Sequence, residues 1–121
     1  MTEIFKRNFL FFPFMQLNGM KSLVDLFRLE QEIQRAKLQN QNQYALQLYD
    51  QVINLKSLLP NRFGLAKTIA EKAFLLEQCG FYREALQSLQ IAANITKSSP
   101  NQEFSQYLNQ QIDTLSNRLA F

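Results

Sequence analysis

The fold of this chain is predicted by one stretch of its sequence, Gln78-Cys79-Gly80-Phe81-Tyr82-Arg83-Glu84-Ala85-Leu86-Gln87-Ser88-Leu89-Gln90-Ile91-Ala92. Gly80 indicates a tight turn, because the residue after a helix often needs a positive φ that glycine adopts without strain. Ala85 supplies a small side chain where the helices on either side of the turn come closest, and Leu89 and Ala92 continue that face at helical spacing. The stretch therefore predicts two helices packed against each other across a short turn.

Residues that break helices are scarce in the rest of the chain. The 121 residues include only three glycines and three prolines, and 46% of all residues are hydrophobic. β-branched residues are also sparse, so the composition favours an all-α fold. The length is that of one domain with a core of its own.

Apolar residues recur at helical spacing along most of the chain, and polar or proline-containing segments interrupt them. The first helix is expected to begin at Asn18 or Ser22, either of which can cap it, and to end in the polar segment 39–42. Four further helices are expected at about 43–58, 62–78, 81–97 and 102–119.

Local signals also predict how these helices end and which faces they bury. Pro60 ends the second helix, because proline cannot continue the hydrogen-bond ladder, and Asn61 is the expected cap of the third. The inward stripe of the first helix is expected to consist of Leu23, Leu26, Phe27, Leu29, Ile33 and Ala36.

Residues 1–20 form a segment of unusual composition, with five of the eleven phenylalanines. Its apolar run is short and broken by Pro13, and no small-residue cleavage site follows, which argues against a secretory signal. A bilayer span would need about 20 apolar residues, more than this run contains, so we expect no transmembrane helix here.

Three interpretations of this Phe-rich segment stay open: it covers the end of the helical domain, it contacts a partner or a second copy, or it lies on a membrane surface. Exposed phenylalanines would form an adhesive patch, so we expect them to be buried within the chain or across an interface. Deleting Met1 to Phe14 should then cause aggregation or loss of assembly. The interface residues are expected to be Phe9, Phe11, Phe12 and Phe14.

A period of forty residues relates two parts of the chain. It aligns Ala45-Leu46-Gln47 with Ala85-Leu86-Gln87, Asn54 with Asn94, and Pro60-Asn61 with Pro100-Asn101. Each Pro-Asn pair precedes a new helix, so the period is structural. Internal periods of this size indicate stacked helix pairs.

The second copy of the period resembles the tetratricopeptide repeat family, in which a glycine closes the first helix and Tyr, Ala and Pro follow at set spacings. The matching residues are Gly80, Tyr82, Ala85, Leu89, Ala92 and Pro100. The first copy carries Asn40, Asn42, Ala45, Tyr49, Val52 and Pro60, so the turn glycine and its tyrosine are lost. The forty-residue period exceeds the family's usual period of about 34 and is similar to that of its longer-helix variants.

The resemblance implies a short right-handed superhelix over residues 21–121, with two helix pairs and a C-terminal capping helix. It also implies that the first helices of the pairs form a concave surface that binds a peptide or helix of a partner protein. Amides on that surface would hydrogen-bond a peptide backbone, or alternatively they only solvate an ordinary surface. The expected binding residues are Phe27, Gln31, Gln34, Lys67, Phe74, Gln78, Tyr107 and Gln111.

The chain lacks the residues that most chemistry requires. It has no histidine and only one cysteine, Cys79, so the commonest general base, the usual zinc ligand and an internal disulfide are all excluded. We expect no catalytic, cofactor or metal site. The function expected is a cytoplasmic, non-enzymatic protein–protein interaction module, an adaptor, scaffold or assembly subunit, that binds a protein partner or a second copy of itself.

Two alternatives stay open. One is a peripheral membrane protein anchored by the Phe-rich segment. The other is a regulatory or ligand-sensing helical module that is associated with nucleic acid. The net charge of +3 is small and scattered, which argues against nucleic acid as the main partner. The densest basic run consists of Lys56, Arg62, Lys67 and Lys72.

Overall fold

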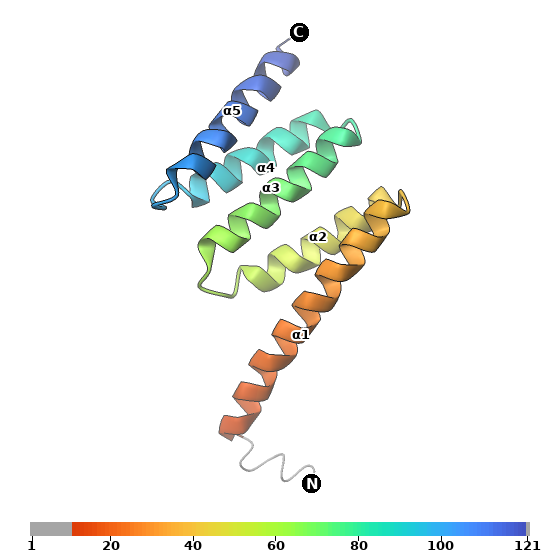
Figure 1. Ribbon diagram of the computed structural model, residues 1–121, viewed down its shortest axis with the longest axis vertical. Coiled ribbons are helices and arrows are strands. Elements are labelled where there is room, and N and C mark those ends of the chain that lie inside the picture. Colours follow the sequence, from red (N-terminus) through yellow and green to blue (C-terminus); the bar gives the residue numbers. More distant parts are fainter. Residues whose placement is uncertain (1–10, 121) are drawn as a thin grey trace.

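The computed structural model describes the backbone of residues 11–120 and the side chains of residues 23–120. It confirms the all-α class, with five helices and no strand in residues 11–120. Consecutive helices run antiparallel and each packs against the next, as Figure 1 shows. The helices are α1 (Phe11–Leu38), α2 (Asn42–Lys56), α3 (Arg62–Gln78), α4 (Tyr82–Ile95) and α5 (Gln102–Leu119).

The start of α1 differs from the prediction. The helix begins at Phe11 and continues through Asn18 and Ser22, so neither of these residues is its cap. Pro13 falls in the first turn, where a missing N–H leaves no hydrogen bond unmade. The predicted burial of Phe9, Phe11, Phe12 and Phe14 concerns side chains outside the described residues.

The turns after α1 and α3 have the same geometry. Gly80 has φ +87°, which confirms the prediction, and the N–H of Phe81 donates to the carbonyl of Leu76 at 2.9 Å. One period earlier, Asn40 has φ +60° and the N–H of Gln41 donates to the carbonyl of Ala36 at 2.8 Å. Both turns are Schellman motifs, and asparagine tolerates the left-handed conformation that one of them requires.

The helix starts after each Pro-Asn pair also correspond. The Oδ1 atom of Asn61 accepts from the N–H of Gly64 at 2.9 Å, and that of Asn101 accepts from the N–H of Phe104 at 3.1 Å. The predicted cap at Asn61 is therefore confirmed. The forty-residue period of the sequence appears twice in the backbone, once at the turns and once at the caps.

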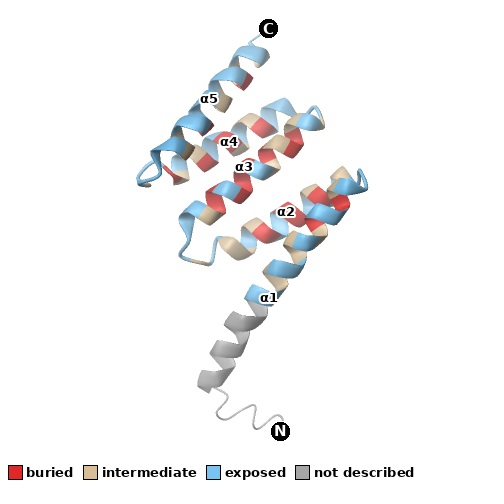
Figure 2. Ribbon diagram, viewed as in Figure 1, coloured by how far each residue is buried: buried red, intermediate tan, exposed pale blue. Residues whose placement is uncertain are grey.

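The core divides into two clusters of buried side chains, visible as the red segments of Figure 2. Leu46 of α2 packs against both clusters and joins them. The C-terminal cluster comprises Leu65, Ala66, Ile69, Ala70, Ala73, Leu76, Ala85, Leu89, Ala92, Leu108 and Leu115. The N-terminal cluster comprises Ile33, Ala36, Ala45, Leu48, Tyr49, Val52 and Leu75.

Helix α5 has one apolar face and one polar face. Ile69 and Ala73 of α3 are buried among α4 side chains, but the α5 residues one period later are Asn109 and Asp113, which are exposed. Leu115, one period after Leu75, is buried in the C-terminal cluster. At the positions where α3 has apolar residues that pack in the core with α4, α5 therefore has polar residues that face solvent.

Helix α1 has the complementary pattern. Thr68 and Leu75 of α3 are buried against the α1–α2 pair, but the α1 residues one period earlier are Arg28 and Arg35, which are exposed. Charged residues at these positions face solvent rather than a preceding helix.

The predicted inward stripe of α1 is correct only in part. Ile33 and Ala36 are buried, whereas Leu23 and Phe27 are 56% and 65% exposed. Lys56, the last residue of α2, pairs with Glu30 at 3.0 Å, so the N-terminal half of α1 runs past the end of α2 (Figure 1). Within residues 11–120, none of the helices combines the length and apolar character needed to cross a membrane.

Candidate interaction surfaces

A small pocket lies where α1 and α3 face each other over α2. Its volume is about 210 Å³, and we call it the α1–α3 pocket. Its wall comes from three helices and is mostly polar. The lining residues are Glu30, Gln31, Ile33, Gln34, Tyr49, Val52, Thr68 and Glu71.

A hydrogen-bonded chain fixes one side of this pocket. The Nζ atom of Lys56 donates to Thr68 Oγ1 at 2.8 Å and forms an ion pair with Glu30 Oε2 at 3.0 Å. The Thr68 hydroxyl in turn donates to the carbonyl of Gly64 at 3.1 Å. The Lys56 side chain is only 19% exposed whereas that of Glu30 is 44% exposed, so the ion pair is partly open to water, and the contacts of Lys56 link α1, α2 and α3.

Tyr49 contributes a buried phenol to the same wall. It is 1% exposed, and its Oη atom accepts from Lys37 Nζ at 3.3 Å. Burial, together with the negative charge of Glu71, raises the pKa of Tyr49 to about 12, so the phenol is protonated at neutral pH. None of the described residues accepts a hydrogen bond from this hydroxyl.

Aromatic side chains connect α3 to α5 beside the pocket. Phe74 and Tyr107 meet edge to face with ring centroids 6.0 Å apart, and Phe63 and Phe104 do so at 5.1 Å. Tyr107 remains 42% exposed, so the Phe74–Tyr107 pair is accessible from solvent. Edge-to-face pairs of this kind fix ring orientation without covering the ring faces.

The predicted binding residues fall into two groups in the structure. Gln31 and Gln34 line the α1–α3 pocket, and Phe74 contacts Tyr107 across α3 and α5. The remaining predicted residues line none of the pockets described here: Lys67 and Gln78 are exposed on α3, Gln111 is half-buried on α5, and Phe27 is exposed on α1.

Tyr49 and Thr68 are among the pocket residues that sequence reasoning missed. From the sequence, Tyr49 is identified only as one residue of the first copy of the forty-residue period. One signal was available: a tyrosine in an otherwise aliphatic core stripe needs a partner for its hydroxyl and is commonly found where a core meets a polar site.

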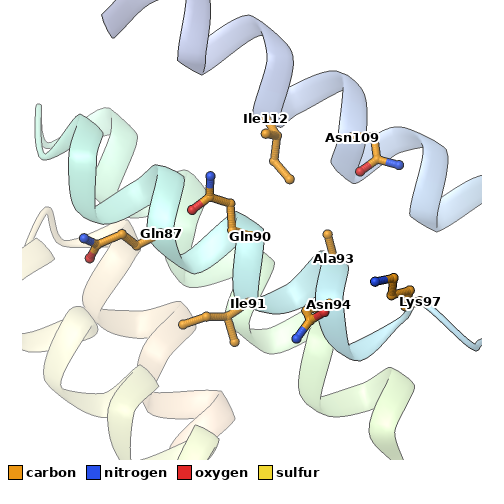
Figure 3. A pocket seen from close by; sticks show the side chains of 8 residues that line it. All are labelled: Gln87, Gln90, Ile91, Ala93, Asn94, Lys97, Asn109 and Ile112. Atoms are coloured by element: carbon orange, nitrogen blue, oxygen red, sulfur yellow. The ribbon is translucent and has the colours of Figure 1, made fainter.

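A second and larger hollow lies between α4 and α5, with a volume of about 750 Å³. Ile91, which is 53% exposed, contributes an apolar surface from α4, and Ile112 and Asn109 point toward α4 from α5 (Figure 3). We call it the α4–α5 groove. The residues that line it are Gln87, Gln90, Ile91, Ala93, Asn94, Lys97, Asn109 and Ile112.

The forty-residue period relates the α4–α5 groove to the space between α2 and α3. One period before Ala93 and Asn109 stand Ile53 of α2 and Ile69 of α3, and both pack in the C-terminal cluster with side chains of α4. The equivalent space between α2 and α3 is thus covered by side chains of α4, so a groove of this kind suits a helix. Sequence reasoning missed the groove, although Ile91 stands out among the amides of the outer face of α4.

The charges on the surface give little support to a phosphate-binding stripe. In the predicted basic run, Lys56 pairs with Glu30 and Lys72 pairs with Asp50 at 2.6 Å. Within residues 23–120, no group of three or more Asp, Glu and Cys side chains is arranged to hold a metal ion. Comparisons of the chain with protein-family models, with curated proteins and with solved structures found no match.

Proposed function

We propose that this chain is a non-enzymatic protein–protein interaction module, an adaptor, scaffold or assembly subunit, that binds a peptide or helix of a partner along α1, α3 and α5. In this proposal the two helix pairs form a short right-handed superhelix of the tetratricopeptide type, with α5 as the cap. The matched turns at Asn40 and Gly80 support it. A cytoplasmic location is part of the proposal, since the free thiol of Cys79 suits a reducing compartment.

The observation that carries the proposal is the polar wall of the α1–α3 pocket. Gln31 and Gln34 each offer an amide donor and acceptor, which match the alternating groups of an extended peptide backbone. The Tyr49 hydroxyl can donate to a backbone carbonyl, and Glu71, exposed at the rim, can accept from a basic side chain. A segment carrying Lys or Arg at this position is therefore the favoured ligand.

The aromatic pair extends the site along α3. Glu71 lines the pocket and Phe74 follows it by one turn of the same helix, a rise of about 4.5 Å. A bound segment can therefore place a polar residue in the pocket and an apolar residue against Tyr107. The pairing of Lys56 and Lys72 with carboxylates gives the nucleic-acid alternative no support.

A selection of peptides displayed on phage tests this site directly. We expect the wild-type chain to enrich peptides that share a basic residue, and Gln34→Arg to weaken their binding at least about tenfold, or about 1.4 kcal/mol. The matched control is Ile91→Arg, an exposed change in the α4–α5 groove that should leave binding unaltered.

Two outcomes would contradict the proposal. Selection without any enriched family would argue against a peptide-binding surface. Peptides that tolerate Gln34→Arg but not Ile91→Arg would move the binding surface to the α4–α5 groove.

A further inference from the structure

Three large apolar side chains are exposed together on α1. Leu23, Val24 and Phe27 are 56%, 53% and 65% exposed, and they share one side of the helix because they are spaced three and four residues apart. We call them the α1 patch. Apolar groups gathered in this way generally mark a contact surface.

This patch is separate from the face by which α1 joins the domain. Ile33 and Ala36 are buried in the N-terminal cluster, and Leu26 and Leu29 pack against it. The α1 patch lies near the middle of the helix, on the N-terminal side of Ile33 and Ala36. Because α1 has 28 residues and α2 only 15, α2 ends before it can cover the patch. The other described helices lie on the far side of α2 (Figure 1).

We propose that a second copy of this chain covers the α1 patch, and that the two α1 helices pair with each other. An apolar helical stripe is complementary to itself, so a two-fold axis through it gives a closed dimer. Val24 and Phe27 continue a spacing of three and four residues that begins in the sequence at Leu17 and Met20, and this spacing is typical of paired helices. The side chains of Leu17 and Met20 lie outside the described residues.

The shape of the chain favours an antiparallel pair. The body of each copy packs on the C-terminal half of its α1, whereas the patch lies at the middle of the helix, which continues from there to Phe11. A parallel pair would bring both bodies to the same end of the helices. An antiparallel pair separates them.

The size of the patch fits an interface that continues along the helix. A stable interface buries more than about 1,000 Å² in total, which three side chains alone do not reach. The N-terminal part of α1 adds more than two helical turns beyond Leu23, since the helix begins at Phe11. These residues, 11–22, extend α1 by about 18 Å beyond the patch, so a second helix can continue to run alongside it.

The charges beside the patch favour a protein surface over a membrane. Arg28 pairs with Asp25 at 3.2 Å, and Glu30 pairs with Lys56. Both pairs combine a cation with an anion, so the described part of the flank carries no excess of positive charge, whereas helices that lie on anionic membranes carry mainly Lys and Arg.

The chain's own first ten residues are a poor cover for the patch. Phe27 lies sixteen residues beyond Phe11, about 24 Å along the helix. Ten extended residues span at most about 36 Å, so about half of them would be used in reaching Leu23, about 18 Å along the helix, and only the first few could lie over Phe27.

The mass of the full chain in solution tests the proposal. Sedimentation velocity and light scattering from about 1 µM to about 100 µM cover the affinities expected of a specific dimer. The wild-type chain should reach twice its mass of 14.2 kDa, and the double variant Val24→Glu, Phe27→Glu should stay at the single mass throughout. The matched control is Leu38→Glu, a change on the same helix at a side chain that is 85% exposed, and it should remain dimeric.

Folding of each variant is checked by circular dichroism, and the milder Phe27→Gln, which should raise the dissociation constant about tenfold, provides a second measurement. A wild-type chain that is monomeric over the whole range would overturn the proposal. So would a folded double variant that dimerises as well as the wild type. A monomeric wild-type chain that floats with phosphatidylcholine–phosphatidylserine vesicles would assign the patch to a membrane surface instead.

Discussion

Replacing Gly80 by alanine isolates the cost of one backbone conformation. The φ of Gly80 is +87°, and a Cβ atom added there would meet no other heavy atom within 4 Å. No side chain has to move, so only the left-handed conformation itself is penalised. We expect Gly80→Ala to lower the free energy of unfolding by about 1–2 kcal/mol. Gly80→Val should cost more, because a β-branched side chain is worse in this region.

Asn40 provides an internal comparison at the equivalent turn. Because Asn40 holds φ +60° in the native chain, Gly80→Asn should cost clearly less than Gly80→Ala. The reciprocal change, Asn40→Gly, should be neutral or stabilising, whereas Asn40→Ala should be destabilising. The expected order of stability at both turns is therefore glycine, asparagine, alanine.

Urea unfolding followed by far-UV circular dichroism measures these differences. A change of about 1–2 kcal/mol is a large fraction of the 5–15 kcal/mol typical of a domain, so the midpoint should fall visibly at constant slope. Arg83→Ala, an exposed change on the next helix, is the control and should stay within about 0.5 kcal/mol. If Gly80→Ala unfolds at the midpoint of the wild type and of Arg83→Ala, the turn does not constrain the backbone as described.

Three other changes test the packing, the caps and the buried phenol. Ala85→Leu should cost about 1–3 kcal/mol in urea unfolding, because Ala85 is fully buried and a larger side chain would overpack the core; an unchanged midpoint would refute the α3–α4 packing. Asn61→Ala and Asn101→Ala should each lower the free energy of unfolding by about 1 kcal/mol, since each loses one hydrogen bond to a helix N–H. A neutral result for either change would show that its cap is not formed. Burial raises the pKa of Tyr49 to about 12 from the ordinary value of 10.0, so its contribution to stability should be complete below pH 10 and be lost as the pH rises toward 12. Ultraviolet titration of the phenols should show a late component that Tyr49→Phe removes, and if the variant instead loses amplitude near pH 10, the Tyr49 phenol is not buried.

The parts of the fold that local sequence signals determine were predicted well. Helix α3 has the predicted bounds Arg62–Gln78, with the predicted Asn61 cap and the predicted positive φ at Gly80 after it. Caps and turns depend on a few adjacent residues, so the sequence contains most of what is needed to locate them. Asn40 was expected to mark a lost turn glycine, but its turn is retained, because asparagine also adopts the left-handed conformation.

Features that depend on distant helices were predicted less well. Phe27 fits the apolar stripe of α1 by spacing, but it is exposed because α2 ends before reaching it, and spacing alone says nothing about the length of a neighbouring helix. Gln31 and Gln34 were predicted as surface residues and do line a pocket. A tyrosine in an aliphatic stripe indicates a nearby polar site, but the place of Tyr49 in that pocket also depends on how α1 and α3 meet over α2, which local patterns do not encode.

The division of the core into two clusters has a consequence for the dynamics of the chain. The buried apolar contacts between the α1–α2 pair and the rest are few, chiefly those of Leu46, Ile53 and Leu75, so we expect the pair to open as a separate cooperative unit while α3, α4 and α5 stay closed. Native-state hydrogen exchange should then be faster in α1 and α2 than in α3. The α1–α3 pocket spans the boundary between these units, with Gln34 on one side and Glu71 on the other. A ligand that contacts both sides would slow exchange in α1 and α2 far from any residue it touches.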